Sequence, residues 1–212
     1  MLPWPVAGLL MAAALVGQEA LLAALGTSNS LAQTAYRMLV WTIGSTSLAL
    51  ILLPQRRPAY LLGALVCAGL MAWALWLQYG LQLDPCPLCV FQRIAVIATG
   101  VVFLLAAVHN PGRVGAILYA ALTVIISGVG AALAAWHVWI QAQPKGAVAA
   151  CGMGLNYMLE TLPLTEVIGR VLKGSGECAE QGWLFMGLAI PSWTFVFFIA
   201  MIASSIALID RD

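Results

Sequence analysis

Long apolar segments, separated by short polar ones, constrain this chain more than any other feature of its sequence. Four of them, residues 59–79, 90–108, 114–140 and 184–209, reach or approach the length of about 20 apolar residues that a membrane-spanning helix needs. Only 8% of the residues are charged, against about 25% in soluble domains, so the main solvent must be lipid. Because lipid requires each segment to satisfy its own backbone hydrogen bonds, the sequence predicts an all-α integral membrane protein with a four-helix transmembrane bundle over residues 59–212.

Residues 1–58 form a hydrophobic extension in front of this bundle. Their apolar segments 2–25 and 36–53 are interpreted as two further membrane helices, which would return the chain to the same side of the membrane. A signal peptide is an alternative for the first segment, although such a signal usually begins with a positive region and no Lys or Arg precedes Arg37. A start of translation at Met38 is a third alternative.

The positive charges indicate an orientation, because cytoplasmic loops of membrane proteins are enriched in Lys and Arg. Four arginines fall on one side of the predicted spans: Arg56, Arg57, Arg113 and Arg211. That side is expected to be cytoplasmic, which places the polar segment 82–89 and the long segment of about 141–181 on the outer face. Lys145, Arg170 and Lys173 weigh less because they are spread along the long segment. The formal net charge of +1 gives no reason to expect nucleic acid as a partner.

The long outer segment contains a short amphipathic pattern. Apolar side chains recur there at helical spacing, with charged ones on the other face: Leu164, Val167, Ile168, Val171 and Leu172 against Glu166, Arg170 and Lys173. The pattern predicts a helix that either lies in the membrane surface or packs on the end of the bundle. Either arrangement would hold the segment near the bilayer.

Cys86 and Cys89 stand in a Cys-Pro-Leu-Cys motif where the outer loop meets the second span. This spacing brings two sulfurs close enough for a reversible disulfide, and the peptide dipoles at a helix N-terminus stabilise a thiolate. Arg93 follows Cys89 by four residues and shares its helix face. An ionisable residue in an apolar span indicates function, here a guanidinium that holds a quinone oxygen and stabilises charge on Cys89. An interfacial arginine that only reaches toward the membrane surface is the alternative.

Cys151 and Cys178 flank the predicted amphipathic helix. A disulfide between them, as a structural staple, would contribute about 3 kcal/mol. Two disulfides that face one compartment can instead exchange by thiolate attack, and glycines beside both cysteines would let Cys178 approach Cys86. Two inert disulfides, or a zinc site built from the four cysteines, are the alternatives. The fifth cysteine, Cys67, lies in an apolar run and is interpreted as a small buried apolar residue.

Several further pieces of sequence accompany these cysteines. They are Pro85-Cys-Pro-Leu-Cys89 with Gln92-Arg93, Cys151, Leu162-Pro-Leu164, Ser175-Gly-Glu-Cys-Ala-Glu180 with Trp183, and Gly187-Leu-Ala-Ile-Pro-Ser-Trp193. Together they resemble the DsbB family of disulfide bond formation proteins. The resemblance covers about residues 59–212 and implies a quinone-dependent protein thiol oxidase in a bacterial inner membrane, with a bundle of DsbB type and redox loops facing the periplasm. Residues 1–58 fall outside the family's pattern.

The resemblance also implies roles for individual residues. It assigns four catalytic cysteines and two further residues at the quinone: Cys86, Cys89, Cys151 and Cys178, with Arg93 and His137. Cys151 would receive the thiolate of a soluble partner similar to DsbA, and Cys178 would pair with Cys151 at rest and with Cys86 during exchange. Cys89 would face ubiquinone or menaquinone. For the histidine, a satisfied interfacial side chain is the alternative.

Two other functions are alternatives. A vitamin K epoxide reductase-like protein also joins a CxxC at a quinone site to loop cysteines, but in that family the loop pair precedes the CxxC, whereas here the CxxC comes first. A metal-binding membrane protein that uses the four cysteines would be distinguished by its metal content.

Overall fold

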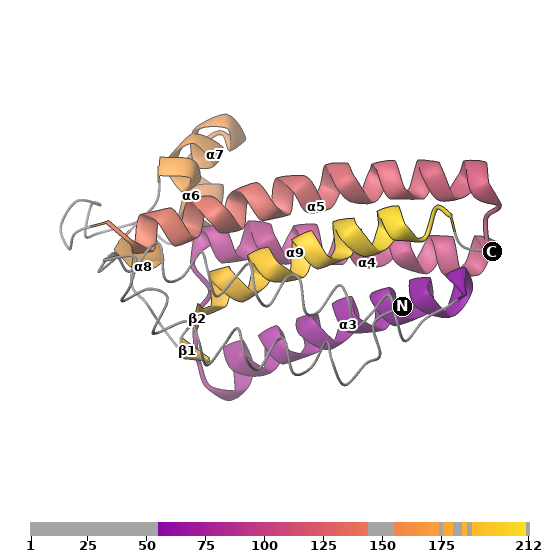
Figure 1. The fold of residues 1–212 in the computed structure, drawn as a ribbon. Helices are drawn as coiled ribbons and strands as arrows, with labels where there is room; N and C mark the ends of the chain where they lie inside the picture. The colour runs from indigo at the N-terminus through magenta and orange to yellow at the C-terminus, as the bar shows by residue number, and fades with distance from the viewer. Residues whose placement is uncertain (1–54, 144–154, 174–175, 180–183, 186–187, 211–212) are drawn as a thin grey trace, which may run out of the picture.

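The computed structural model of the chain describes residues 55–143, 155–173, 176–179, 184–185 and 188–210. Four helices in these ranges are long and apolar enough to cross a membrane: α3 (Arg56–Gly80), α4 (Pro87–His109), α5 (Arg113–Gln141) and α9 (Ile190–Ala207). They run side by side as an up-and-down bundle (Figure 1). The predicted four-helix transmembrane bundle is therefore confirmed. The two further helices expected before residue 54 lie outside the described residues.

The last membrane helix begins later than predicted. The sequence predicts a span from residue 184, but α9 begins at Ile190. The residues before it include two short antiparallel strands, β1 (Leu184–Phe185) and β2 (Leu188–Ala189). Pro191 stands in the first turn of α9, where the missing N–H would have no helical partner in any case. Hydropathy alone does not separate these strands from the helix, because both are apolar.

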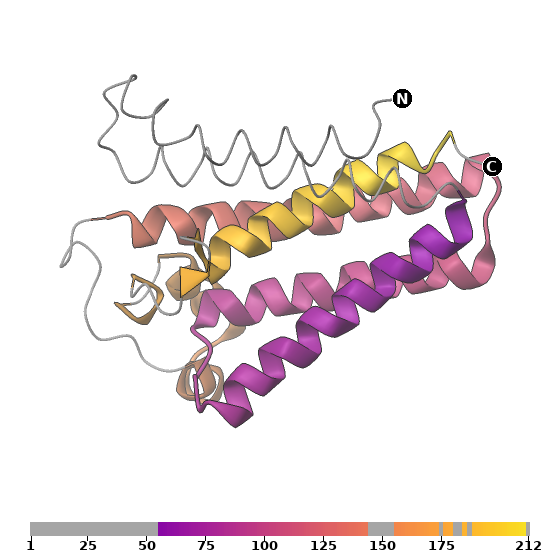
Figure 2. The ribbon, with the colours of Figure 1, turned by 60° about the horizontal axis from the view of Figure 1, so that its bottom comes forward.

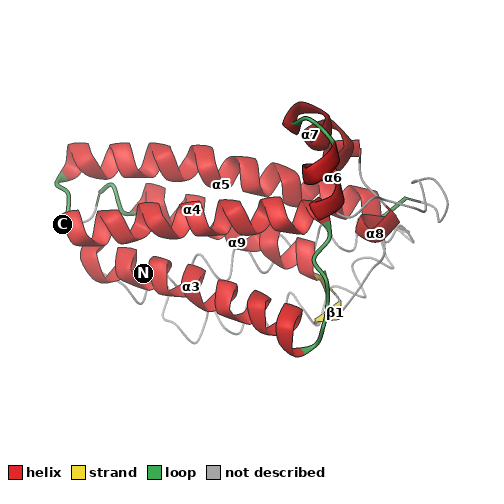
Figure 3. Cartoon of the chain, turned by 180° about the vertical axis from the view of Figure 1, so that it is seen from behind, coloured by secondary structure: helices red, strands yellow, loops and turns green. Residues whose placement is uncertain are grey.

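One end of the bundle collects the cysteines and is called the cysteine end. Cys86 and Cys89 lie there at the start of α4, and Cys178 lies there in the short helix α8 (Gly176–Ala179). Helices α6 (Leu155–Thr161) and α7 (Leu164–Lys173) lie beside the same end (Figures 1 and 3). The segments that follow α5 in the chain are thus gathered next to the CxxC motif rather than at the far end of the bundle.

The predicted amphipathic helix is α7 (Leu164–Lys173). Val167 and Val171 are buried in the same cluster as Cys86 and Cys178. The charged side chains of Glu166 and Arg170 are exposed and form an ion pair with each other. Of the two arrangements expected, the structure therefore has the helix packed on the end of the bundle.

The opposite end, called the arginine end, is tied together by a buried arginine. Arg56 donates hydrogen bonds to the backbone carbonyls of Pro111 (3.3 Å) and Ile209 (3.2 Å). These bonds join the start of α3 to the turn before α5 and to the end of α9. Arg113 forms an exposed ion pair with Asp210 at the same end.

Small residues allow close approach of the helices in the middle of the bundle. Gly130 of α5 faces the ring of Phe198 in α9, and a Cβ on this glycine would overlap ring atoms. Cys67 of α3 is 3% exposed and packs against Gly100 of α4. Such contacts hold membrane helices together, because lipid provides no hydrophobic force between them. The interpretation of Cys67 as a small buried residue is confirmed.

The bundle is not closed equally on all sides. Helix α3 packs on α4, α4 on α5, and α5 on α9, whereas α3 and α9 make few contacts with each other. Figure 2 shows α3 diverging from α9 toward the cysteine end.

Candidate active site

The Cys-Pro-Leu-Cys motif forms the N-terminus of α4. Cys86 is the N-cap residue in an extended conformation, and Pro87 opens the helix, where its fixed φ suits a helix start. The Sγ of Cys86 accepts a hydrogen bond from the backbone N–H of Cys89 (3.4 Å) and lies 3.0 Å from the Sγ of Cys89. Small side-chain rotations would bring these sulfurs into a disulfide. The helix N-terminus stabilises negative charge on either of them.

Arg93 is held beside this motif by α3. Its guanidinium donates one hydrogen bond to the side-chain oxygen of Gln78 (2.5 Å) and another to the backbone carbonyl of Ala74 (3.3 Å). Arg93 is half-buried, and it lies one helical turn after Cys89. The contacts fix a cation at the depth of the first turn of α4, where charge on a sulfur or a bound molecule would be stabilised.

Buried His137 joins three elements at the cysteine end. The side-chain amide nitrogen of Gln92 lies 3.2 Å from Nδ1, and the backbone carbonyl oxygen of Cys178 lies 3.1 Å from Nε2. Because a carbonyl can only accept, Nε2–H donates to the carbonyl of Cys178, and with this orientation of the Gln92 amide its N–H donates to Nδ1. The same Nε2 lies 3.8 Å from the Sγ of Cys86. His137 is therefore a buried link between α4, α5 and α8.

Cys178 lies against the CxxC motif. It is 1% exposed, and its Sγ, the Sγ of Cys86 and a ring nitrogen of His137 all lie within 4.8 Å of one another. The hydrogen bond from the imidazole to the carbonyl of Cys178 holds α8 in this position. The structure thus brings together three of the four predicted cysteines, whereas Cys151 lies outside the described residues.

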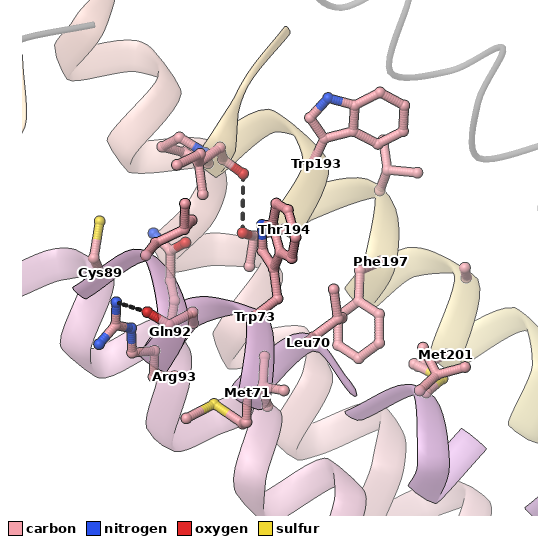
Figure 4. A pocket seen from close by; sticks show the side chains of 18 of the residues that line it. Leu70, Met71, Trp73, Cys89, Gln92, Arg93, Trp193, Thr194, Phe197 and Met201 are labelled. Carbon is pink, nitrogen blue, oxygen red and sulfur yellow. Dashed lines mark hydrogen bonds between the residues drawn. The ribbon is translucent and has the colours of Figure 1, made fainter. Parts of the chain in front are cut away.

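A cavity of about 970 Å³ lies between α3, α4 and α9. Cys89, Arg93 and His137 line it near the cysteine end, and Ser204 and Leu208 line it near the arginine end. Figure 4 shows that most of its other walls are apolar: Leu70, Met71, Trp73, Trp193, Phe197 and Met201. The volume is within the usual range for small-molecule sites, about 300–1,000 Å³. Its shape and lining suit a long apolar molecule whose polar head reaches the cysteine end.

Two residues of this site were missed by the reasoning from sequence. Gln78 accepts a hydrogen bond from Arg93. The one feature of the sequence that could have indicated this role is that Gln78 is a polar residue in the last turn of an apolar span. Gln92 was noted only as a neighbour of Arg93, yet it is 4% exposed and orients His137. A polar residue buried in an apolar helix is the signal that could have indicated it.

The chain is similar in sequence to the members of one known family. The sequence model of the family described as "Disulfide bond formation protein DsbB" matches residues 56–208. A protein named "Disulfide bond formation protein B" from Hahella chejuensis is 51% identical over 147 residues, covering 69% of this chain and 89% of the relative. Proteins of the same name from Chromohalobacter salexigens and Methylobacillus flagellatus are 50% and 46% identical, over 69% and 68% of this chain and 86% and 87% of theirs.

With its four apolar helices, the chain is a multi-pass membrane protein of the class that forms disulfide bonds. It belongs to the DsbB family of disulfide bond formation proteins. The match favours this class over the vitamin K epoxide reductase-like alternative.

Proposed function

We propose that this chain is a quinone-dependent protein thiol oxidase that reoxidises a periplasmic DsbA-like partner. The observation that carries the proposal is the placement of Cys86. Its sulfur lies beside those of both Cys89 and Cys178, and Cys89 and Arg93 line an apolar cavity. Sulfurs of the loop and of the CxxC motif are thus adjacent to a space that can hold a lipid-soluble acceptor.

The loop cysteines would receive electrons from the partner. A thiolate of the partner attacks Cys151 of a Cys151–Cys178 disulfide, forming a mixed disulfide and releasing the Cys178 thiolate. Cys178 then attacks Cys86 of the Cys86–Cys89 disulfide, which releases the Cys89 thiolate. The second thiol of the partner resolves the mixed disulfide, so the partner leaves oxidised. Cys151 then attacks Cys178, restores the loop disulfide and leaves Cys86 and Cys89 as a dithiol.

The Cys86–Cys89 dithiol would be reoxidised at the cavity. A ubiquinone or menaquinone bound there would supply the two-electron acceptor. The residues present fit such a ring, because the walls are apolar and Arg93 provides a fixed cation. Arg93 stabilises negative charge first on Cys89 and then on the acceptor oxygen. The net reaction converts one dithiol and one quinone into one disulfide and one quinol, with two electrons and two protons transferred.

The bundle would lie in the bacterial inner membrane with the cysteine end toward the periplasm. The support is the distribution of basic residues, because Arg56, Arg57 and Arg113 all lie at the opposite end. A periplasmic cysteine end would also place the thiols in a compartment where disulfides persist.

The proposal is tested by following quinone absorbance with the purified full chain in sealed vesicles. With a reduced DsbA-like protein added on the side of the cysteine end, we expect quinone reduction with either short-chain ubiquinone or menaquinone. Replacing Cys86 or Cys89 by Ser should reduce turnover to background, because each forms half of the disulfide that is cycled. The variant Cys67→Ser is the matched control and should retain wild-type turnover.

A second electron donor separates the two cysteine pairs. The variant Cys178→Ser should lose turnover with the protein partner but still reduce quinone with a small dithiol, which can reduce the CxxC motif directly. Wild-type quinone reduction by Cys89→Ser would show that the role given to Cys89 is wrong. Turnover only with the partner on the side of the arginine end would refute the orientation.

A further inference from the structure

The sulfur atoms at the cysteine end and the imidazole of His137 together form a donor set, of which the oxidase reaction does not require the imidazole. The Sγ atoms of Cys86 and Cys178 and a nitrogen of His137 lie within 4.8 Å of one another, and all three side chains are buried. The Sγ of Cys89 lies 3.0 Å from that of Cys86. Thiol exchange needs adjacent sulfurs, but it does not need an imidazole nitrogen at 3.8 Å from the central one.

The separation between the Sγ of Cys86 and the Nε2 of His137 is close to that in a tetrahedral metal site. With metal–sulfur bonds of about 2.3 Å and metal–nitrogen bonds of about 2.0–2.1 Å, tetrahedral angles place two sulfurs about 3.8 Å apart and sulfur and nitrogen about 3.5 Å apart. The Nε2 of His137 is already 3.8 Å from the Sγ of Cys86. The Sγ of Cys89 lies closer to that of Cys86 (3.0 Å) than in such a site, so rotation of the Cys89 side chain would have to widen that separation.

We propose that the reduced form of the cysteine end binds a zinc-like divalent ion through the sulfurs of Cys86, Cys89 and Cys178 and through Nε2 of His137. Three thiolates and one imidazole are a donor set typical of zinc, since soft sulfur ligands select it over calcium or magnesium. Binding displaces three thiol protons and yields a centre with a net charge of −1. The Arg93 guanidinium, one turn along α4, partly compensates that charge.

The hydrogen bonds of His137 allow this role after one rearrangement. Its Nε2 now carries the proton that points to the carbonyl of Cys178. Metal binding moves the ring proton to Nδ1, and rotation of the Gln92 amide by half a turn lets its oxygen accept from Nδ1. A ligand histidine usually donates its second N–H to such an acceptor, which fixes the ring and raises its basicity.

Metal binding and thiol oxidation would exclude each other. A sulfur that holds the ion cannot attack a disulfide, and an oxidised pair has no thiolates to offer. The inhibition that follows rests on the proposed function, whereas the binding itself does not. The ion would therefore accumulate on the protein when the quinone supply fails and the cysteines remain reduced.

The test is a titration of the reduced, purified full chain with Co²⁺ in detergent without oxygen. We expect one ion per chain, with the visible absorption of tetrahedral Co²⁺ and thiolate-to-metal charge-transfer bands, and displacement of both by Zn²⁺. Protein with its disulfides formed should show neither signal. Absence of the tetrahedral spectrum from the reduced protein would overturn the proposal. If that same preparation still oxidises its partner with quinone, the proposed function is unaffected.

Three variants locate the site. His137→Ala should weaken Co²⁺ binding by about tenfold or more, and Gln92→Glu should strengthen it, because a carboxylate is a better acceptor for the Nδ1 proton. Cys67→Ser is the matched control and should bind as the wild type does. Unchanged affinity in His137→Ala would place the ion elsewhere and refute the assignment, even if the wild type binds cobalt.

Discussion

The cysteine end and the middle of the bundle bury polar side chains for different purposes. At the cysteine end, Gln92 and His137 bond across α4 and α5 and reach the backbone of α8. In the middle, Thr99 of α4 and Ser127 of α5 are both fully buried, and their hydroxyl oxygens lie 3.0 Å apart. The first pair of residues lies beside sulfur atoms at the edge of a cavity, whereas the second pair joins two helices.

The two cysteine environments show the same contrast. Cys67 packs against Gly100 among apolar neighbours in the middle of the bundle. Cys86, at a helix N-terminus, has a second sulfur at 3.0 Å and an imidazole nitrogen at 3.8 Å. Among the described residues, the neighbours of Cys67 in this cluster are apolar or aromatic and carry no positive charge. Position in the bundle, more than residue type, therefore distinguishes the cysteines proposed to react from Cys67, which packs.

The sharpest test of this contrast is Arg93→Met, which removes the cation at the cysteine end. Loss of a charge-assisted hydrogen bond to the acceptor, about 1.5–3 kcal/mol, should lower kcat/KM for quinone by one to two orders of magnitude. The kcat/KM of Arg93→Lys for quinone should lie between those of the wild type and Arg93→Met, because lysine keeps the positive charge but not the planar guanidinium that donates two hydrogen bonds. The thermal unfolding midpoint in detergent should change little. A variant that loses stability but keeps its kcat/KM for quinone would make Arg93 a structural residue.

A smaller effect, on stability and not on chemistry, is expected from Gly130→Ala. The added methyl group would overlap the ring of Phe198, which is fully buried and cannot move aside. Overpacking of this kind costs about 1–3 kcal/mol. Gly128→Ala is the matched control on the same helix, because a Cβ there meets no atom within 4 Å. Unfolding of both variants in the same detergent should show that Gly130→Ala is the less stable of the two. Equal stability of the two variants would contradict the tight contact between α5 and α9.

The membrane spans were predictable from sequence because lipid leaves few alternatives. A long apolar run must be helical to satisfy its backbone, and predicted and observed bounds of α3, α4 and α5 agree within a few residues. The start of α9 was not predictable in this way. Strand β2 pairs with β1 through backbone hydrogen bonds. A pattern of apolar side chains does not indicate such pairing.

The candidate site was predictable in part: the residues close in sequence follow from local spacing, and the approach of Cys178 to Cys86 was expected from the flanking glycines and from the resemblance to the DsbB family. The spacing of Cys86, Cys89 and Arg93 along one helix is a local feature, and the structure keeps it. The bonds of Arg93 to Gln78 and of His137 to the backbone of Cys178 join residues 15 and 41 positions apart. Such contacts depend on how α3, α5 and α8 pack on α4, which local spacing does not encode.

The smallest expected effect is on stability and concerns the buried hydroxyl groups in the middle of the bundle. It tests whether these groups only hold the helices together. The Thr99 hydroxyl donates to the carbonyl of Ala95 (2.8 Å), so the 3.0 Å contact requires Ser127 to donate to Thr99. Thr99→Val keeps the shape but removes that acceptor, and should cost about 0.6 kcal/mol, with about 1.7 kcal/mol as the upper end for such bonds. Thr123→Val is the control, because the Thr123 hydroxyl bonds the carbonyl of Tyr119 in its own helix. A double-mutant cycle with Ser127→Ala, measured by unfolding in detergent, isolates the interaction energy of the Thr99–Ser127 pair.

A different outcome would contradict the contrast between the two regions. If Thr99→Val lowered quinone turnover at unchanged stability, the middle of the bundle would take part in the chemistry, as the cysteine end is proposed to do.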